Sequence, residues 1–259
     1  MGDKKQRFVV ISDIHGFYDE MIDALNKVNF NPETDHLITC GDHWDRGSQP
    51  VEVMRYLMKL PHKTLILGNH EELFQTCCQN GYWQSHDIHN GTFDSICELG
   101  GAGGGRSFDE CCIIAEQRAK PFLDSMVDYF ETEHYVFVHS WIPVNCNDGL
   151  PAWYKRHRKY SKKEDWREAH HSEWENARWM NPLEMAMNGY GIEKTIVCGH
   201  WHCSAGWALK NKTFDEFGEN ACFDPYYYED KLIMIDACTA HTGKVNVLVL
   251  EDNFMENAQ

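Results

Sequence analysis

Seven residues of types that commonly bind metal ions stand directly after short apolar runs of the sequence. They are Asp13, His15, Asp42, Asn69, His139, His200 and His202. Carboxylate, imidazole and amide donors without a thiolate suit Mn, Fe or Zn better than Cu(I), and the set is too rich in imidazole for Ca or Mg alone. The set offers more ligands than one tetrahedral ion can use, so it favours two metal ions that share a carboxylate and a water. Asp42 is the expected bridge because it lies between the two halves of the set in the sequence.

The apolar runs that precede these residues are predicted to be β-strands. They are rich in β-branched residues and have almost no polar positions, which is typical of strands covered on both faces. The runs are 8–11, 37–40, 64–67, 135–138, 195–198, 232–235 and 245–250. Because an α/β sheet places its ligand site at the carboxyl ends of its strands, we expect the polar residues to meet there.

Helical patterns separate the first three runs. Apolar residues recur at helical spacing in 21–28 and in 51–58, and Pro50 opens the second of these helices. This alternation predicts parallel strands in an α/β core. The last two runs are joined by a Thr-Gly-Lys segment and are predicted to form a hairpin.

Two stretches lack this alternation. Residues 74–125 are of mixed character, and residues 143–192 carry many charged residues and tryptophans. Both are interpreted as insertions over one edge of the sheet, so residues 1–259 are predicted to form a single domain.

Composition and charge narrow the class of protein. The 259 residues are 42% hydrophobic and 25% charged, as in an ordinary globular protein. No apolar run approaches the roughly 18–20 residues of a membrane span, and the polar start has no signal-peptide core, so we expect a cytoplasmic protein without membrane contact. A net charge of −16 disfavours general nucleic-acid binding, because an acidic surface repels the phosphate backbone. The 11 cysteines include no Cys-x-x-Cys pair, which favours reduced thiols over a disulfide framework or zinc ribbon.

The order and spacing of the polar residues resemble those of the calcineurin-like metallophosphoesterases. The matching segments are Asp13-x-His15-Gly16, Gly41-Asp42-x-x-Asp45-Arg46-Gly47, Gly68-Asn69-His70-Glu71, His139 and Gly199-His200-x-His202. Within that family the chain is most similar to the bacterial and phage serine/threonine phosphoprotein phosphatases, over about residues 8–250. The resemblance implies a four-layer α/β/β/α sandwich with two facing sheets, and a dinuclear site that is usually reconstituted with manganese.

The resemblance also implies a role for each matched residue. First-metal ligands are matched by Asp13 and His15, the bridge by Asp42, and second-metal ligands by Asn69, His139 and His200. Arg46 matches an arginine that binds the phosphate, and His70 matches a general acid paired with Asp45. These roles agree with the chemistry of the groups, since a guanidinium binds two phosphate oxygens at once and an imidazole can protonate a leaving alkoxide near neutral pH.

Three positions depart from the phosphatase pattern. A second phosphate-binding arginine is often found in a Trp-x-Arg motif, where this chain has Asn181; Arg178 and Arg106 are candidate substitutes. The usual Asp-x-Gly near the C-terminus is Asp236-Ala237-Cys238. His202 is typical of the wider superfamily, where such a histidine binds the first metal, and alternate residues of an extended chain point to the same side.

The predicted function is metal-dependent hydrolysis of a phosphoester, with a metal-bridging hydroxide as the nucleophile. The expected enzyme is a phosphomonoesterase of the serine/threonine phosphatase type. The expected substrate is a phosphoprotein or a small phosphoester. One alternative is hydrolysis of a dinucleoside polyphosphate or cyclic nucleotide at the same site. A second alternative is a non-catalytic metal-binding scaffold, which would need none of Asp45, Arg46 and His70. His43 and Trp44, which stand inside the second motif, are expected to pack or be exposed rather than line the cleft.

Overall fold

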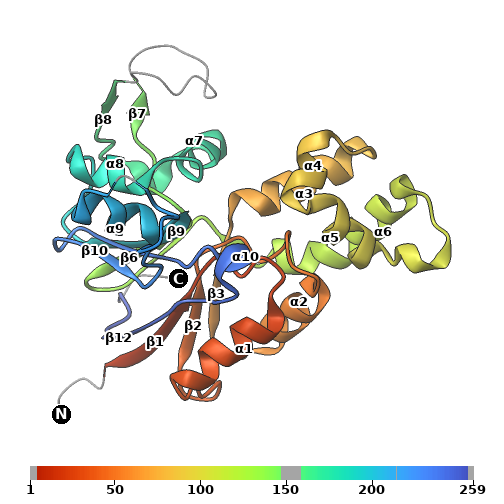
Figure 1. Ribbon diagram of the computed structural model, residues 1–259, viewed down its shortest axis with the longest axis horizontal. Helices are drawn as coiled ribbons and strands as arrows, with labels where there is room; N and C mark the ends of the chain where they lie inside the picture. Colours follow the sequence, from red (N-terminus) through yellow and green to blue (C-terminus); the bar gives the residue numbers. More distant parts are fainter. Residues whose placement is uncertain (1–4, 147–158, 214, 256–259) are drawn as a thin grey trace.

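Two five-stranded sheets form the centre of the computed structural model, which describes residues 5–146, 159–213 and 215–255. The first sheet has the order β12-β1-β2-β3-β4, with β1 (Gln6–Ile11), β2 (His36–Thr39), β3 (Lys63–Ile66) and β4 (Met126–Val127) parallel and β12 (Val247–Asp252) antiparallel to β1. The second has the order β10-β11-β9-β6-β5 and contains β10 (Tyr226–Tyr228), β11 (Leu232–Asp236), β9 (Thr195–His202), β6 (Tyr135–Val138) and β5 (Tyr129–Glu131). A short pair, β7 (Asn145–Cys146) and β8 (Tyr160–Ser161), lies apart from both sheets (Figure 1).

The alternation of side chains along the strands explains why the sheets face each other. In β1, Phe8 and Val10 join a core that also contains Phe137 of β6 and Val197 of β9. The intervening residues of β1 point the other way, into a core shared with helices. Each central strand is therefore apolar on both faces, as its sequence predicts, because one face contacts the opposite sheet and the other contacts helices.

Helices cover the outer face of each sheet and complete four layers. On the first sheet these are α1 (Tyr18–Lys27), α2 (Pro50–Lys59), α3 (Asn69–Asn80), α5 (Thr92–Gly100) and α6 (Phe108–Leu123). The short helix α4 (Ser85–Asn90) contributes no residue to this core. On the second sheet they are α7 (His171–Ala177), α8 (Pro182–Met187) and α9 (Cys203–Asn211). The remaining short elements are η1 (Ala102–Gly104), η2 (Trp166–Glu168) and α10 (Thr239–Thr242). The four-layer α/β/β/α expectation is thereby confirmed.

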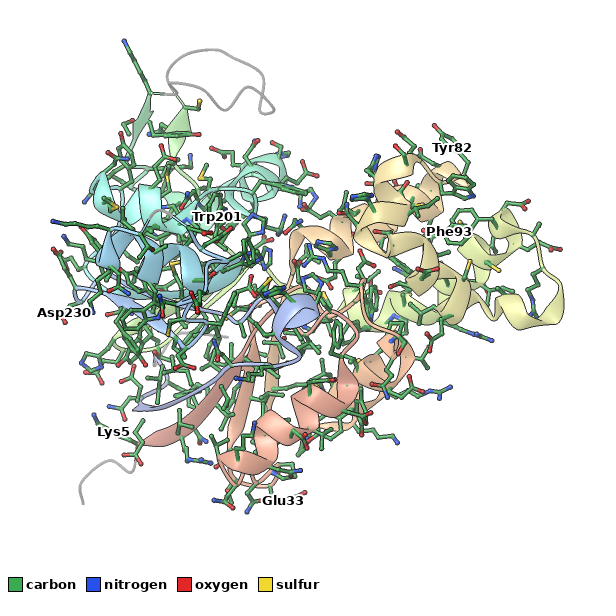
Figure 2. All side chains as sticks on the ribbon, viewed as in Figure 1. Lys5, Glu33, Tyr82, Phe93, Trp201 and Asp230 are labelled. Carbon is green, nitrogen blue, oxygen red and sulfur yellow. The ribbon has the colours of Figure 1, made fainter. Side chains whose placement is uncertain are left out.

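A helical arm projects from one side of the first sheet (Figure 1). It consists of α3 to α6, and Figure 2 shows Tyr82 and Phe93 on it. The arm contains the predicted insertion 74–125 apart from its last few residues, since β4 begins at Met126 just after it. Of the other predicted insertion, residues 147–158 lie outside the described residues.

The predicted hairpin between the last two strands is wrong. Residues of β11 pair with β9 and β10 in the second sheet, whereas β12 pairs with β1 in the first sheet. The connecting segment contains α10, which is capped by Gly243 with a φ of 62°. The chain crosses between sheets here because each strand finds an apolar partner in a different layer, which a local turn signal does not reveal.

All 11 cysteines lie within the described ranges and are free thiols, most of them buried. No helix within the described ranges is long and apolar enough to cross a membrane.

Candidate metal centre and active site

The carboxyl ends of strands from both sheets meet at a cavity of about 140 Å³. Its lining consists of Asp13, His15, Asp42, Arg46, Asn69, His70, Asn90, Trp179, His200 and His202. The other two predicted site residues lie directly behind this lining: Asp45 contacts His70, and His139 contacts Asn69. The structure thus brings together all the metal-ligand and catalytic residues that the sequence predicts.

The backbone around the cavity is unusually strained. Asp13, His15, Asp42, Asp45, Arg46 and His200 all have positive φ, between 50° and 75°. Such values are rare for residues other than glycine and are retained where the surrounding structure enforces them. Their concentration at the predicted site residues indicates that the turns after the strands are shaped to aim these side chains into the cavity.

Two groups of side chains converge closely enough to hold a metal ion each. One is His15, Asp42 and His70, and the other is Asp42, His139 and His200; within each group the ligand atoms lie within 4.8 Å of one another. Asp42 belongs to both. Its Oδ2 lies 3.7 Å from His15 Nε2 and 3.8 Å from His70 Nε2, and its Oδ1 lies 3.4 Å from His139 Nε2.

Backbone carbonyls orient two of the imidazoles. Nδ1 of His15 donates to the Trp44 carbonyl at 2.9 Å, and Nδ1 of His139 donates to the Cys40 carbonyl at 2.8 Å. Each ring therefore presents Nε2 to the cavity, which is the usual arrangement of a metal-binding histidine. Burial and the nearby Arg46 hold the pKa of His15 well below its usual value, so the ring is neutral, as a ligand must be.

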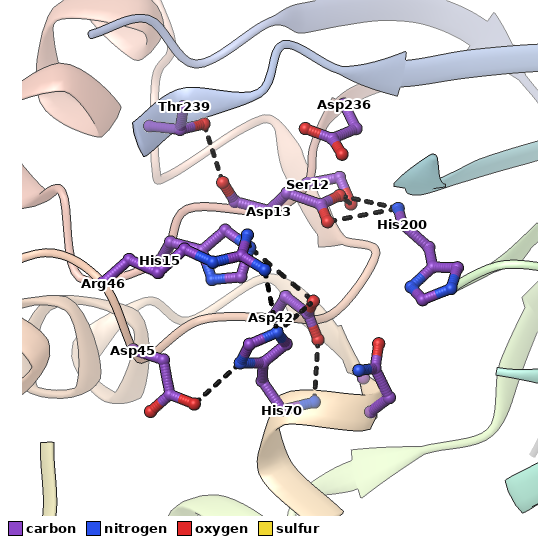
Figure 3. A network of polar contacts seen from close by, with 12 residues as sticks. Ser12, Asp13, His15, Asp42, Asp45, Arg46, His70, His200, Asp236 and Thr239 are labelled. Atoms are coloured by element: carbon purple, nitrogen blue, oxygen red, sulfur yellow. Dashed lines mark hydrogen bonds and ion pairs between the residues drawn. The ribbon is translucent and has the colours of Figure 1, made fainter. Parts of the chain in front are cut away.

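A carboxylate, not a carbonyl, orients His70. Its Nδ1 lies 2.7 Å from Asp45 Oδ2 (Figure 3). The same oxygen accepts a hydrogen bond from the Thr92 hydroxyl at 2.7 Å. Burial by itself lowers the pKa of His70, but the carboxylates of Asp42 and Asp45 outweigh it and the net shift is upward. Of the imidazoles described, His70 is thus arranged to carry a proton at the cavity.

The guanidinium of Arg46 lies within hydrogen-bond distance of two imidazoles. Nη1 is 2.5 Å from His15 Nε2, and Nη2 is 3.2 Å from His70 Nε2. The close approach of Gly91 fixes the Arg46 backbone, because a Cβ at Gly91 would lie 2.2 Å from the Arg46 nitrogen. Arg46 therefore contributes a positive charge to the cavity wall.

Glu71, whose role the sequence did not predict, joins two of the motifs. One carboxylate oxygen accepts hydrogen bonds from the backbone of Asp42 at 3.1 Å and Gly68 at 2.9 Å, and the other accepts from the backbone of His43 at 2.9 Å. Burial raises the pKa of Glu71, but His43 and the backbone N–H groups outweigh this and lower it to about 2. The close packing also explains why position 68 is a glycine, since a Cβ there would lie 2.2 Å from Asp42 Oδ1.

His43 and Trp44 are fully buried, so the prediction that they do not line the cleft is confirmed. Nδ1 of His43 lies 3.2 Å from Glu71 Oε1, and Nε2 lies 2.7 Å from the Thr39 hydroxyl. Both residues therefore support the loop that carries Asp42.

The side of the cavity around Asp13 is rich in carboxylates. Burial, together with the charges of Asp236 and Asp42, raises the pKa of Asp13 well above its usual value. Both oxygens of Asp13 accept hydrogen bonds from the His200 backbone, at 3.1 and 3.0 Å (Figure 3). Buried carboxylates that repel one another favour a bound cation, which makes Asp236 a further residue of the site.

His202 lies in the cavity wall beside these carboxylates. Its Nε2 is 3.9 Å from Asp236 Oδ2 and its Nδ1 is 3.6 Å from Glu216 Oε2. It belongs to neither group of converging ligand atoms. Because His200 has a φ of 63°, the segment is not a regular strand, and the alternation rule used to align the two histidines does not hold across it.

Comparison with known proteins agrees with this geometry. The family model of the calcineurin-like phosphoesterases matches residues 6–204. The chain belongs to the calcineurin-like phosphoesterase family. This membership confirms the resemblance inferred from the motifs.

Individual members of the family are similar over short segments. Serine/threonine-protein phosphatase 2 of Salmonella typhimurium is 39% identical over 84 residues, which are 29% of this chain and 38% of that protein. The symmetrical bis(5'-nucleosyl)-tetraphosphatase of Salmonella arizonae is 46% identical over 63 residues, 24% of this chain and 22% of that protein. The chain thus matches well under half the length of these relatives.

Solved structures of the family share the fold at low sequence identity. A crystal structure described as a proposed diadenosine tetraphosphatase covers 99% of this chain and 97% of its own, with a TM-score of 0.52 and 14% identity. The cold-active protein-tyrosine phosphatase of a Shewanella species covers 96% of this chain and 76% of its own, with a TM-score of 0.50 and 16% identity.

The candidates for a second phosphate-binding arginine in this phosphoesterase do not reach the cavity. Arg178 is buried and forms ion pairs with Glu72 and Asp128. Arg106 donates to the carbonyl of Gly101 at 2.7 Å, and Asn181 caps α8 by accepting from the backbone of Leu183 and Glu184. Arg46 is the one arginine among the described residues that line the cavity.

Proposed function

We propose that this chain is a phosphoester hydrolase that works with two divalent metal ions, manganese in the first place, with iron or zinc as alternatives. The observation that carries the proposal is that one cavity contains both a shared carboxylate, Asp42, and the groups needed for catalysis, Arg46 and His70. A non-catalytic metal-binding scaffold would need neither Arg46 nor His70.

The donor chemistry of the site fits two ions. Asp13, His15 and Asp42 are proposed to hold the first ion, with His202 as a further ligand. Asp42, Asn69, His139 and His200 are proposed to hold the second. When bound, the ions would acidify water and offset the charge of the phosphoryl group.

The chain's own residues would then complete the reaction. Arg46 is proposed to bind two oxygens of the phosphoryl group with its planar guanidinium, which favours in-line geometry. His70 is proposed to hold a proton on Nε2 and deliver it to the departing oxygen, while Asp45 keeps Nδ1 protonated and stabilises the imidazolium.

The proposed substrate class is a phosphomonoester of the type handled by protein phosphatases. The segment shared with the Salmonella serine/threonine phosphatase supports this class. A dinucleoside polyphosphate is the second candidate, supported by the segment shared with the tetraphosphatase. A cytoplasmic location and a single domain over residues 1–259 stay predictions from the sequence.

The test is reconstitution of the chelated protein with manganese, iron or zinc, followed by assays on phosphopeptides, p-nitrophenyl phosphate, bis-p-nitrophenyl phosphate and dinucleoside polyphosphates. We expect no activity after chelation and recovery with metal. Asp42→Asn should weaken both metal sites and reduce turnover sharply, because each carboxylate oxygen faces a different group of ligands. Full activity after exhaustive chelation would contradict the proposal.

A further inference from the structure

Trp179 is the one apolar side chain among the described residues that line the cavity. The other nine carry carboxylate, imidazole, amide or guanidinium groups. Polar and charged groups of that kind account for binding a phosphoryl group and metal ions. An indole ring adds little to such binding, but its position in the wall allows it to contact an apolar or aromatic part of a substrate.

The Trp179 ring is open to solvent and close to the candidate metal ligands. The residue is 41% exposed, and its ring lies 5.8 Å from the ring of His200 at an interplanar angle of 86°. An indole ring in the wall of a polar cavity can pair with an aromatic ring of a ligand in a stacked or edge-to-face arrangement.

The segment around Trp179 is anchored on both sides. Its neighbour Arg178 is buried and held by two carboxylates and by the carbonyl of Leu67 at 3.2 Å. The next residue, Met180, accepts a hydrogen bond at 2.5 Å from Ser140, which directly follows His139. The position of Trp179 is therefore fixed relative to the cavity, and a ligand that stacks on it would not have to order the segment.

Asn90 contributes a polar group from another part of the fold. It ends α4 in the helical arm, whereas Trp179 follows α7 over the second sheet (Figure 1). A substrate in the cavity therefore meets a polar residue from the arm and an aromatic one from the second sheet's side.

We propose that Trp179 determines substrate specificity by stacking against a planar aromatic group that is attached to the phosphoryl group. The proposal rests on the proposed phosphoester hydrolysis and deepens it. Two sources share this chemistry: the phenyl ring of a tyrosine-like ester and the base of a nucleotide. The phenyl ring of a tyrosine-like ester lies closer to phosphorus than a nucleotide base does. We favour this source because the Trp179 ring contacts His200, one of the proposed metal ligands.

The test separates ring binding from chemistry with phosphonates, which are not hydrolysed. Calorimetry on the manganese-loaded full chain would compare phenylphosphonate, methylphosphonate and an adenosine 5'-phosphonate. We expect the wild type to bind at least one of the two phosphonates that carry an aromatic ring more tightly than methylphosphonate. Trp179→Ala should reduce that preference by about 2- to 10-fold, the range for one aromatic pair, and Trp179→Phe should keep most of it.

Trp83→Ala is the matched control, because Trp83 is a comparably exposed tryptophan (46%) that does not line the cavity. It should leave the preference unchanged. If the wild type binds only phenylphosphonate more tightly than methylphosphonate, the aromatic group is that of a tyrosine-like ester. If it binds only the adenosine 5'-phosphonate more tightly, the aromatic group is the base of a nucleotide. If Trp179→Ala changes the affinity for all phosphonates equally, the ring-binding role is wrong even where phosphoesters are hydrolysed. If no phosphoester is hydrolysed with any metal, it is the proposed function that fails.

Discussion

At the scale of single residues, the motifs predict which side chains lie together at the cavity. They do not predict which other residues hold those side chains in position. The ligand and catalytic candidates all lie at or directly behind one cavity. The supporting roles of Glu71 and Asp236 did not follow from the motifs, because each depends on a partner in another element. Glu71 binds the loop of Asp42, and Asp236 lies in β11 beside Asp13 and His202.

The role of His70 is tested by His70→Asn. We expect metal content to be kept and kcat to fall by roughly 10²–10⁴-fold, the scale of general acid catalysis. The loss should be smaller for p-nitrophenyl phosphate than for an alkyl phosphate, because a good leaving group needs little protonation. An equal loss for both substrates would contradict the assignment. His86→Asn is the control, since His86 is an exposed imidazole outside the cavity lining.

At the scale of elements, local patterns succeed where neighbours in sequence are neighbours in space. The strands and helices from β1 to β3 follow their apolar periodicity and pair in parallel as predicted. The hairpin prediction failed because β11 and β12 belong to different sheets, a long-range choice that the intervening turn does not encode. The positive φ values at the ends of β1, β2 and β9 could not be predicted from propensity either, because the surrounding site enforces them.

An ion-pair cluster at Glu131 joins three such elements. This carboxylate of β5 accepts from Arg167 of η2 at 2.8 and 2.6 Å and lies 2.8 Å from Lys194, just before β9. Burial raises the pKa of Glu131, but Arg167 and Lys194 outweigh it and lower the pKa below its usual 4.5. A carboxyl group whose folded pKa is depressed stabilises the fold above its unfolded pKa, and this stabilisation is lost as the pH falls through the folded value.

We therefore expect Glu131→Gln to lower the free energy of unfolding by about 1 kcal/mol at pH 7, since the partners are partly exposed. The difference from wild type should shrink as the pH falls below about 4.5. Urea denaturation at a series of pH values measures both effects. Glu133→Gln, two residues along the chain and solvent-exposed, should change stability much less. A difference that persists unchanged at low pH would contradict the ion-pair explanation.

At the scale of the whole molecule, two facing sheets bring strand ends together that are far apart in the sequence. Asp13 and Asp42 come from the first sheet, and His139 and His200 come from the second, so the site exists only when both sheets are packed. The chain as a whole carries a charge of −16, and buried carboxylates add to this at the cavity. An anionic substrate therefore depends on Arg46 and on bound cations to offset the local charge.

The number of metal ions in the fully active protein tests the account most directly. The chelated chain would be titrated with manganese while bound metal and turnover are measured in the same samples. Because one carboxylate oxygen of Asp42 faces His15 and the other faces His139, we expect activity to reach its maximum only when about two ions are bound per chain. Full activity with a single tightly bound ion per chain would contradict the dinuclear site.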